Sequence, residues 1–201
     1  MRKVLLFLVV LLAGCGGNAQ LAAPPTAAPQ TSTSDKLAPG EFQARWWTWA
    51  SQPSNSNPVS DTSGRFCMRD QPVEVWLLAG SLGEGPVERQ CRVPASKPLL
   101  APVVNLASDV AECERFMKSA QGEVLMDGST QALTRVSATP FTYEARAGNP
   151  FGAQVGRVNS VGCGLYAWIN PPASGEHDLH IRGSADGKDV DVKYKLIVGA
   201  D

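Results

Sequence analysis

The chain is poor in the residues on which most catalytic and metal sites depend. It has two histidines, His177 and His180, and both fall within one predicted strand. It contains no Cys-x-x-Cys pair and no two histidines at the spacing of zinc ligands. Acid–base catalysis therefore has few candidate residues, and the sequence indicates no cofactor.

The sequence motifs of several enzyme classes are also absent. Residues 80–83, Gly-Ser-Leu-Gly, lack the Gly-x-Ser-x-Gly spacing of a serine hydrolase. Residues 61–64, Asp-Thr-Ser-Gly, contain one residue more than the aspartic protease motif, and the second copy that those enzymes need is missing. An Asx turn at Asp61 is the simpler interpretation. The aspartates around residue 186 lack the spacing of an EF-hand loop and are expected in a solvated hairpin turn.

Long apolar runs and clusters of one charge are scarce as well. Residues 4–12 form an apolar run of nine residues, whereas a transmembrane helix needs about 20, and no other run approaches that length. Lys and Arg are scattered rather than gathered in a stripe. The formal net charge is −1, and it becomes −3 when Arg2 and Lys3 are removed. Nucleic acid is therefore not an expected partner.

The N-terminus matches the signal of a bacterial lipoprotein. Residues 1–3 carry positive charge, residues 4–12 are apolar, and Leu-Ala-Gly precedes Cys15. In this pattern the cysteine is acylated and anchors the mature chain to the membrane by its lipid. An ordinary secretory signal with a chance cysteine is the alternative. We expect a lipid-anchored, extracytoplasmic protein of the bacterial cell envelope, in the outer membrane if the host is Gram-negative, because Gly16 rather than Asp follows Cys15.

Composition divides the chain into three segments. Residues 1–14 are the predicted signal peptide. Residues 15–39 comprise the lipidated cysteine and a linker rich in Ala, Pro, Ser and Thr, which cannot bury enough apolar surface to fold. Residues 40–201 are expected to form a single domain, since a domain of this size buries roughly 70% of the surface of its unfolded chain.

The four remaining cysteines are expected to form two disulfides in an oxidising compartment. Four cysteines allow three pairings. We expect Cys67–Cys91, because these two bracket the central predicted strands, and Cys113–Cys163 by elimination. Each bond would stabilise the fold by roughly 3–4 kcal/mol through the entropy of the unfolded chain.

Alternating hydrophobicity and turn residues predict a mainly β domain. Apolar spacing predicts short helices at residues 41–51 and 108–121. Strands are expected at residues 65–68, 73–80, 87–93, 98–106, 123–126, 131–137, 140–146, 162–170, 177–183 and 189–198, with hairpin turns at 127–128 and 186–187 and a loop at 147–161. Pro98 and Pro102 restrict the fourth strand to an edge, a bulge or an extended segment. The pattern predicts an antiparallel β-sandwich, immunoglobulin-like or jelly-roll, with two short helices.

Several stretches resemble a group of secreted bacterial proteins with no established activity. The Trp-rich start at residues 46–49, NPVSDTSGRFC at 57–67, VWLLAG at 75–80, CRVPASKPLLAPVVN at 91–105 and PPASGEHDLHIRG at 171–183 match its pattern. That pattern reads NPxxDxxGxFC, VWFLAG, CxVPxGKALFFPxxN and PPGEHxIHxxG. The chain departs from it where Ser96-Lys97-Pro98 replaces Gly-Lys-Ala and where residues 99–101 replace an aromatic run. The resemblance implies a secreted β-domain and assigns no site residue.

Three aromatic residues are candidates for ligand binding. Trp47 lies off the apolar stripe of the first predicted helix, and Tyr166 and Trp168 alternate with the apolar residues of the strand at 162–170. If exposed, they would form a surface on which sugar rings stack, as in many carbohydrate-binding modules. In a second interpretation a helix covers this face of the sheet and buries Tyr166 and Trp168 against Trp47.

Glu176, Asp178 and His180 are weak candidates for metal ligands, because they share one side of a predicted strand. In the simpler interpretation the residues between them pack inward and the charged side faces water. The leading functional hypothesis is a non-enzymatic, lipid-anchored module that binds an envelope glycan or an envelope protein. One alternative is a hydrolase or lyase acting on an envelope polymer, which would need Asp61 to converge with these three residues. Another is a purely structural subunit of an envelope complex.

Overall fold

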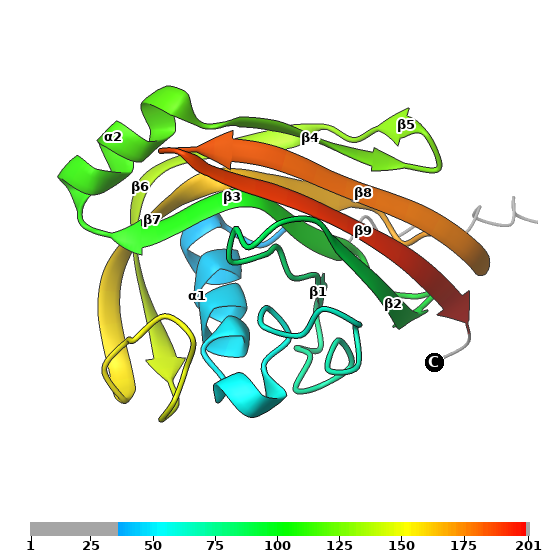
Figure 1. Cartoon of the computed structure of the whole chain (residues 1–201), viewed down its shortest axis with the longest axis horizontal. Helices are drawn as coiled ribbons and strands as arrows, with labels where there is room; N and C mark the ends of the chain where they lie inside the picture. Colours follow the sequence, from blue (N-terminus) through cyan, green and yellow to red (C-terminus); the bar gives the residue numbers. More distant parts are fainter. Residues whose placement is uncertain (1–35, 200–201) are drawn as a thin grey trace, which may run out of the picture. The chain divides into compact units, whose positions relative to one another are not determined.

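The structure, a computed structural model, describes residues 36–199. The predicted signal peptide, Cys15 and most of the predicted linker lie outside the described residues. Within the described range the chain is mainly β, with two α-helices and two sheets (Figure 1). This confirms the predicted class of a mainly β protein with two helices.

The strands form two sheets of mixed direction. Sheet 1 has the strand order β1-β3-β7-β6 and sheet 2 has the order β2-β9-β8-β4-β5. The strands of sheet 1 are β1 (Trp76–Leu77), β3 (Leu99–Ser108), β6 (Leu133–Ala145) and β7 (Gly156–Ile169). The strands of sheet 2 are β2 (Val87–Pro94), β4 (Gln121–Met126), β5 (Ser129–Thr130), β8 (Gly175–Ala185) and β9 (Lys188–Gly199).

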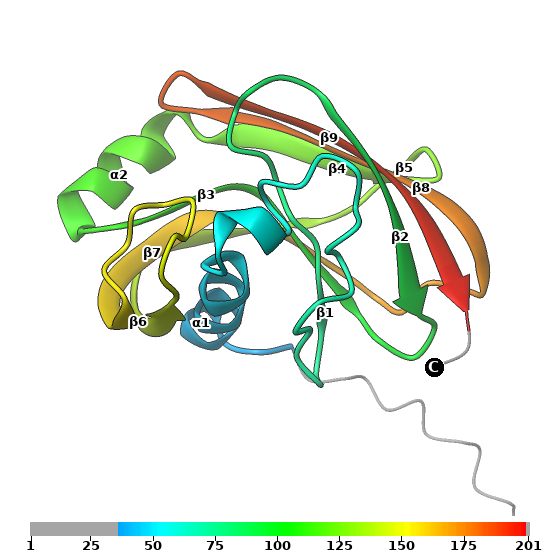
Figure 2. The same ribbon diagram turned by 60° about the horizontal axis from the view of Figure 1, so that its bottom comes forward.

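Sheet 1 is the middle of three layers. Successive side chains of a strand point to opposite faces of the sheet. Along β7, Cys163 and Leu165 join a core shared with sheet 2, whereas Tyr166 and Trp168 join a second core on the other face. The helix α1 (Pro39–Ala50) covers that second face, as Figures 1 and 2 show. The molecule therefore has a sheet–sheet core and a separate sheet–helix core.

The helix α1 forms because its sequence supplies both a start and an apolar face. The Glu41 carboxylate accepts a hydrogen bond from the Ala38 backbone N–H at 3.0 Å, which stabilises the first turn. Phe42, Trp46 and Trp49 recur at helical spacing and are all buried against sheet 1. The predicted helix is therefore confirmed, starting two residues earlier.

The second helix, α2 (Val110–Ser119), closes one end of the sheet–sheet core. Asp109 caps it, since its carboxylate accepts a hydrogen bond from the Glu112 backbone N–H at 2.8 Å. The apolar side of α2 carries Cys113, which forms a disulfide with Cys163 of β7. This bond fastens the helix to sheet 1.

Both predicted disulfides are confirmed. Cys67 pairs with Cys91 across a Cα–Cα distance of 6.0 Å, and Cys113 pairs with Cys163 across 5.7 Å. The first bond ties a long irregular segment to β2, and the second ties α2 to β7. The bonds close loops with sequence separations of 24 and 50 residues.

Both predicted hairpin turns are also present. Asp127-Gly128 and Asp186-Gly187 each have two consecutive residues with positive φ, the conformation that two-residue hairpin turns favour. The second turn joins β8 to β9 as expected. The first joins β4 only to the short strand β5, and the strand predicted next, β6, belongs to the other sheet.

Within residues 36–199 five of the seven strand pairs are antiparallel, as the predicted sandwich requires, and two are parallel. β1 pairs with β3 in parallel, and β2 pairs with β9 in parallel, as Figure 2 shows for β2 and β9. Alternation of apolar and polar residues records which side of a strand is buried and carries no information on the direction of its neighbour.

Three strand predictions fail in their bounds. Residues 65–68 form turns, and only Trp76–Leu77 of the strand expected at 73–80 pairs with a neighbour. Residues 156–161, expected in a loop, extend β7. The bulge that the prolines predicted is present in β3, as a register shift between Pro102 and Val104.

Candidate ligand-binding cleft

The three aromatic candidates do not form a surface. Trp47 is 6% exposed and Tyr166 is 1% exposed, while Trp168 is half-buried against the same core. The helix α1 covers this face of sheet 1, so the three rings do not form an open surface on which a sugar could stack. The predicted exposed aromatic surface is therefore wrong, and the interpretation in which a helix covers this face is confirmed. Of the three residues, only Trp47 lines a cleft.

Tyr166 has a structural role instead. Its hydroxyl donates a hydrogen bond to the Gln43 Oε1 at 3.3 Å, and its ring packs edge-on to Phe42 at 4.9 Å between centroids. Burial raises the pKa of Tyr166, an effect that the side chain of Asn105 opposes in part. The phenol therefore stays neutral and joins α1 to sheet 1.

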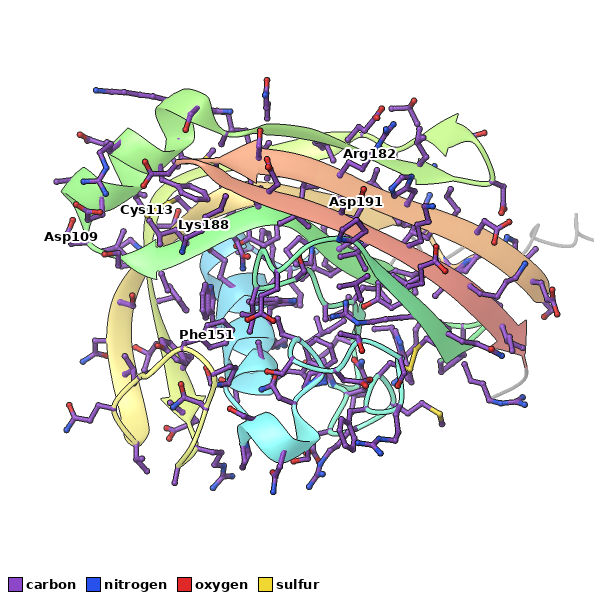
Figure 3. All side chains as sticks on the ribbon, viewed as in Figure 1. Asp109, Cys113, Phe151, Arg182, Lys188 and Asp191 are labelled. Carbon is purple, nitrogen blue, oxygen red and sulfur yellow. A yellow bond between two sulfur atoms is a disulfide. The ribbon has the colours of Figure 1, made fainter. Side chains whose placement is uncertain are left out.

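Glu176, Asp178 and His180 lie on the outward face of sheet 2, where each has a charged neighbour. Lys195 lies 3.8 Å from Glu176 and 3.3 Å from Asp178, and the His180 Nε2 lies 2.7 Å from Asp191. Figure 3 labels Asp191 and Arg182 on this face. Residues 36–199 contain no group of three His, Cys, Asp or Glu side chains placed to hold a metal ion.

Asp61 does not join these residues in a catalytic group. Its carboxylate accepts hydrogen bonds from the Ser63 backbone N–H at 3.2 Å, the Ser63 hydroxyl at 2.8 Å and the Phe66 backbone N–H at 3.3 Å. Partial burial would raise the pKa of Asp61, but these hydrogen bonds outweigh it and the pKa is lowered. The carboxylate therefore stabilises a turn, as the Asx interpretation predicted.

A deep cleft lies elsewhere, between α1, the free side of β3 and the β8–β9 hairpin. Its volume is about 700 Å³, within the range of small-ligand sites. Aromatic, aliphatic and polar residues line it; the lining includes Trp46, Trp47, Gly80, Ser81, Leu82, Glu84, Asn105, Ala107, Phe116, Tyr143, Phe151, Ala153, Lys188 and Asp189. Figure 3 labels Phe151 and Lys188, which line the cleft from the turn before β7 and from the start of β9.

The aromatic wall of the cleft is preformed. Trp47 packs against Trp46 at 5.1 Å, against Phe151 at 5.0 Å and against Tyr143 at 6.0 Å between ring centroids. Edge-on aromatic packing of this kind fixes the rings relative to one another. The Trp47 Nε1 is buried and has no hydrogen-bond partner in residues 36–199. Buried donors are normally paired, and none of the described residues supplies a partner for this one.

The cleft is open because the chain leaves β3 early. Trp76 and Leu77 pair with Leu99 and Leu100, and the Leu78 N–H donates to the Leu100 carbonyl oxygen at 2.9 Å. After Leu78 the chain crosses toward sheet 2, as Figure 2 shows for the segment between β1 and β2. Residues 102–107 of β3 therefore pair with β7 on one side and border the cleft on the other.

A buried arginine holds the chain in this crossing position by hydrogen bonds. Arg89, on β2, is 3% exposed. Its guanidinium donates hydrogen bonds to five neutral oxygen atoms: the carbonyl oxygens of Asp61 (2.7 Å), Val59 (2.9 Å), Ala79 (2.9 Å) and Gly80 (2.8 Å), and the Tyr194 hydroxyl (3.1 Å). A buried cation requires such hydrogen bonds to replace its hydration. Arg89 thus holds the segment after β1, and the loop before it, against sheet 2.

Tyr194 completes the attachment. Its hydroxyl accepts a hydrogen bond from the Ala79 N–H at 3.0 Å and lies 2.9 Å from the Ala79 carbonyl oxygen, to which it donates. The two polar backbone groups of Ala79, which could have continued the pairing with β3, therefore bind Tyr194 and Arg89. Because these groups are engaged by Tyr194 and Arg89, the pairing with β3 does not continue beyond Leu78.

The charges at the cleft are few. Glu84, Lys188 and Asp189 line it and are exposed, which gives the lining a formal charge of −1. The lining contains no histidine and no cysteine. It has shape, aromatic rings and backbone groups, which suit binding, and lacks the paired titratable groups on which acid–base catalysis depends.

The sequence analysis did not single out Arg89 or Tyr194. A signal for Arg89 was present, because it lies on the same side of its strand as Cys91 and Val93. A charged residue on the buried side of a strand demands partners. Four of its five partners are backbone carbonyl groups outside its own strand. The pattern of residue types does not predict which carbonyl groups these are.

Comparison of the chain with protein-family models, curated proteins and solved structures found no match. The motif resemblance to secreted bacterial proteins therefore stays a prediction, and the cleft itself is the basis for a function.

Proposed function

We propose that this protein is a lipid-anchored binding module of the bacterial cell envelope, without catalytic activity, and that it holds its ligand in the cleft between α1, β3 and the β8–β9 hairpin. The observation that carries the proposal is the cleft: about 700 Å³ in volume, with a preformed aromatic wall. A site of this size and composition can enclose a small ligand or a short polymer segment.

The N-terminal signal and the disulfides support the cellular location. Acylation at Cys15 is the expectation from the sequence, and the two disulfides are compatible with an extracytoplasmic protein. No helix within residues 36–199 is long and apolar enough to cross a membrane. A lipid at Cys15 would attach the domain to the membrane in this arrangement.

The alternative of a hydrolase or lyase has less support. Asp61 caps a turn, and Glu176, Asp178 and His180 lie beside Lys195 and Asp191 on the outward face of sheet 2. A groove on that face, about 650 Å³ in volume, is more open than the cleft and is lined by Glu88, Asp178, His180, Lys193 and Lys195. Lys193 pairs with Glu88 at 3.6 Å and Lys195 pairs with Asp178 at 3.3 Å.

Binding can be tested with a residue that lines the cleft. Ala107 is half-buried in the cleft wall, so Ala107→Phe fills the cleft, and Ala153→Phe does so from the neighbouring loop. Ala111 is exposed on α2, and Ala111→Phe is the matched control. The full chain is offered peptidoglycan fragments, envelope glycans and envelope protein extracts, and retained ligands are identified by mass spectrometry.

We expect saturable binding to the unaltered chain and to Ala111→Phe, and at least a tenfold loss in both cleft variants. Circular dichroism and thermal unfolding establish that the variants are folded. Equal binding by the unaltered chain and by folded Ala107→Phe and Ala153→Phe would refute the cleft as the site. Absence of any ligand would favour the purely structural alternative.

A further inference from the structure

We propose that the cleft binds an extended peptide segment, which adds as a strand to the free edge of β3. This inference rests on the proposed function and specifies its ligand. A peptide in a β conformation binds a sheet edge through its main chain and places alternate side chains on the two faces of the sheet. The edge of β3 has the length, the surroundings and the charge for such a partner.

Only the first part of the edge of β3 has a neighbouring strand. β1 occupies it in parallel at Leu99 and Leu100 and then leaves. Residues 102–107 have no neighbouring strand on that side within the described part of the chain, and they line the cleft. Pro102 supplies no N–H, so the hydrogen-bonding edge starts at Val103. A partner of five or six residues, about 16–20 Å long, would continue where β1 stops.

Two of the other sheet edges, those at β6 and β2, are protected. β6, at the far edge of sheet 1, contains Pro140 and a register shift between Val136 and Thr139, devices that discourage further pairing. The β2 edge of sheet 2 is covered, because the Gln90 N–H donates to the Ser63 carbonyl oxygen at 3.0 Å. The edge of β3 beside the cleft lacks both kinds of protection after Val104.

The edge stays open because the segment that could close it is held elsewhere. Arg89 and Tyr194 engage the backbone of Ala79 and Gly80. The chain from Gly80 to Glu84 then forms the opposite wall of the cleft. The segment from Gly80 lies close to β3 at Pro102, so a separate strand would enter beyond that residue, where the cleft opens beside β3.

The two walls determine which side chains the peptide would carry. On the α1 side, Trp47, Tyr143 and Phe151 offer apolar contacts. On the side of sheet 2, the exposed carboxylates of Glu84 and Asp189 outnumber the one ammonium group of Lys188. We therefore infer a peptide with apolar residues at alternate positions and Lys or Arg between them, in preference to an acidic peptide.

The probe is a pool of terminally blocked hexapeptides in which Val, Ile or Phe alternates with Lys, Thr or Glu. The full chain is incubated with the pool, and retained peptides are identified by mass spectrometry. We expect enrichment of the Lys-containing members over the Glu-containing members, and at least tenfold weaker binding to Ala107→Phe than to Ala111→Phe. Amide hydrogen exchange at residues 103–107 should slow when a retained peptide is added.

N-methylation of the peptide distinguishes strand addition from other modes. Alternate amides of an edge-bound strand face β3, so methylation at one alternate set should weaken binding at least tenfold, while methylation at the other set should change it less than threefold. Equal effects of both sets would overturn strand addition. So would unchanged amide exchange at residues 103–107.

The failure of this inference is distinguishable from failure of the proposed function. The apolar dye anilinonaphthalene sulfonate serves as a second probe of the cleft. If no peptide is retained but the dye binds the unaltered chain and is lost in Ala107→Phe, the cleft is a ligand site and the peptide inference is wrong. If neither probe distinguishes Ala107→Phe from Ala111→Phe, both proposals are wrong.

Discussion

At the scale of single residues, Arg89 has an unexpected structural role. Arginine side chains are mostly exposed in proteins, whereas this one is buried. Its five hydrogen bonds join β2, the segment after β1 and the loop around Val59. Removing a buried donor leaves the opposing carbonyl groups unsatisfied, at about 1–3 kcal/mol for each group affected. The arginine also holds Ala79 and Gly80, which follow β1, so that they do not continue the pairing with β3.

Replacing Arg89 by Lys tests this role. Lysine keeps the positive charge but has three donors on a single nitrogen and cannot reach five acceptors spread around a planar group. We expect Arg89→Lys to lower the free energy of unfolding by about 2–4 kcal/mol in urea denaturation. Arg92→Lys, on the exposed side of the same strand, should change it by less than about 0.5 kcal/mol. A similar small change at Arg89 would contradict the role assigned to its hydrogen bonds.

His177 should make stability depend on pH. Its Nδ1 lies 2.6 Å from an Asp127 carboxylate oxygen and its Nε2 lies 2.8 Å from the Ala173 carbonyl oxygen. Only a protonated imidazole can donate to both acceptors. The pKa of His177 is raised above its ordinary 6.5, chiefly by Asp127 and then by Ala173, and the pKa of Asp127 is lowered below 3.8, chiefly by His177.

The sign of the effect follows from these two directions. A raised histidine pKa stabilises the fold below about pH 6.5, and this contribution is lost as the pH rises through the folded pKa. A lowered aspartate pKa contributes above about pH 4 and is lost in more acidic solution. We therefore expect the difference in unfolding free energy between the unaltered chain and His177→Gln to be largest between about pH 4 and 6.5.

An NMR titration of the imidazole provides the direct measurement. Asp127→Asn keeps an oxygen acceptor and tolerates the positive φ of this turn, but it removes the negative charge. The pKa of His177 should then fall toward 6.5. An unchanged pKa in Asp127→Asn would show that the carboxylate does not set the titration.

At the scale of elements, α2 depends on a covalent attachment. It has ten residues, which is too short for a helix to be stable alone in water. Its buried face is limited to Cys113, Phe116 and Met117. The disulfide to β7 therefore contributes much of the stability that holds the helix at the end of the sheet–sheet core.

The two disulfides should differ in their effect. For sequence separations of 50 and 24 residues, the chain-entropy relation gives about 4 kcal/mol for Cys113–Cys163 and about 3.5 kcal/mol for Cys67–Cys91. The double change Cys113→Ala with Cys163→Ala should also accelerate amide exchange throughout α2, whereas Cys67→Ala with Cys91→Ala should leave α2 protected. Unchanged exchange in α2 after loss of Cys113–Cys163 would contradict this dependence.

Several elements were predictable because their signals are local. Phe42, Trp46 and Trp49 recur at helical spacing, and Asp127-Gly128 and Asp186-Gly187 are residue pairs suited to positive φ. The strand predicted at 65–68 failed because Phe66 and Cys67 are buried or half-buried within turns, without a neighbouring strand. Residues 156–161 were missed because their glycine and polar residues resemble a loop, whereas pairing with β6 makes them a strand.

At the scale of the whole molecule, the proposal makes a prediction about attachment to the membrane. The proposal predicts that the full chain incorporates labelled palmitate and sediments with membranes, because acyl chains at Cys15 would contribute about 0.8 kcal/mol for each buried methylene. Cys15→Ala should abolish both. The change Cys67→Ala with Cys91→Ala is the cysteine control and should retain both. Membrane association of Cys15→Ala at the level of the unaltered chain would refute lipid anchoring.

The sequence by itself determined the properties that depend on neighbouring residues. Alternation along β8 predicted that the residues between Glu176, Asp178 and His180 pack inward, and the helical spacing of residues 42–49 predicted the apolar face of α1. The count and positions of the cysteines led to both disulfide pairs. Each of these signals is contained within one element or within the cysteine set.

Only the tertiary structure decided the strand directions and the candidate site. The parallel pairing of β2 with β9 joins strands about a hundred residues apart, and either direction would bury the same side chains. The cover over Tyr166 required α1 to lie on sheet 1, and the cleft required Arg89 and Tyr194 to draw Ala79 away from β3. These outcomes depend on which distant backbone groups form hydrogen bonds with one another. Because every residue has the same backbone carbonyl group, the pattern of residue types does not predict such contacts.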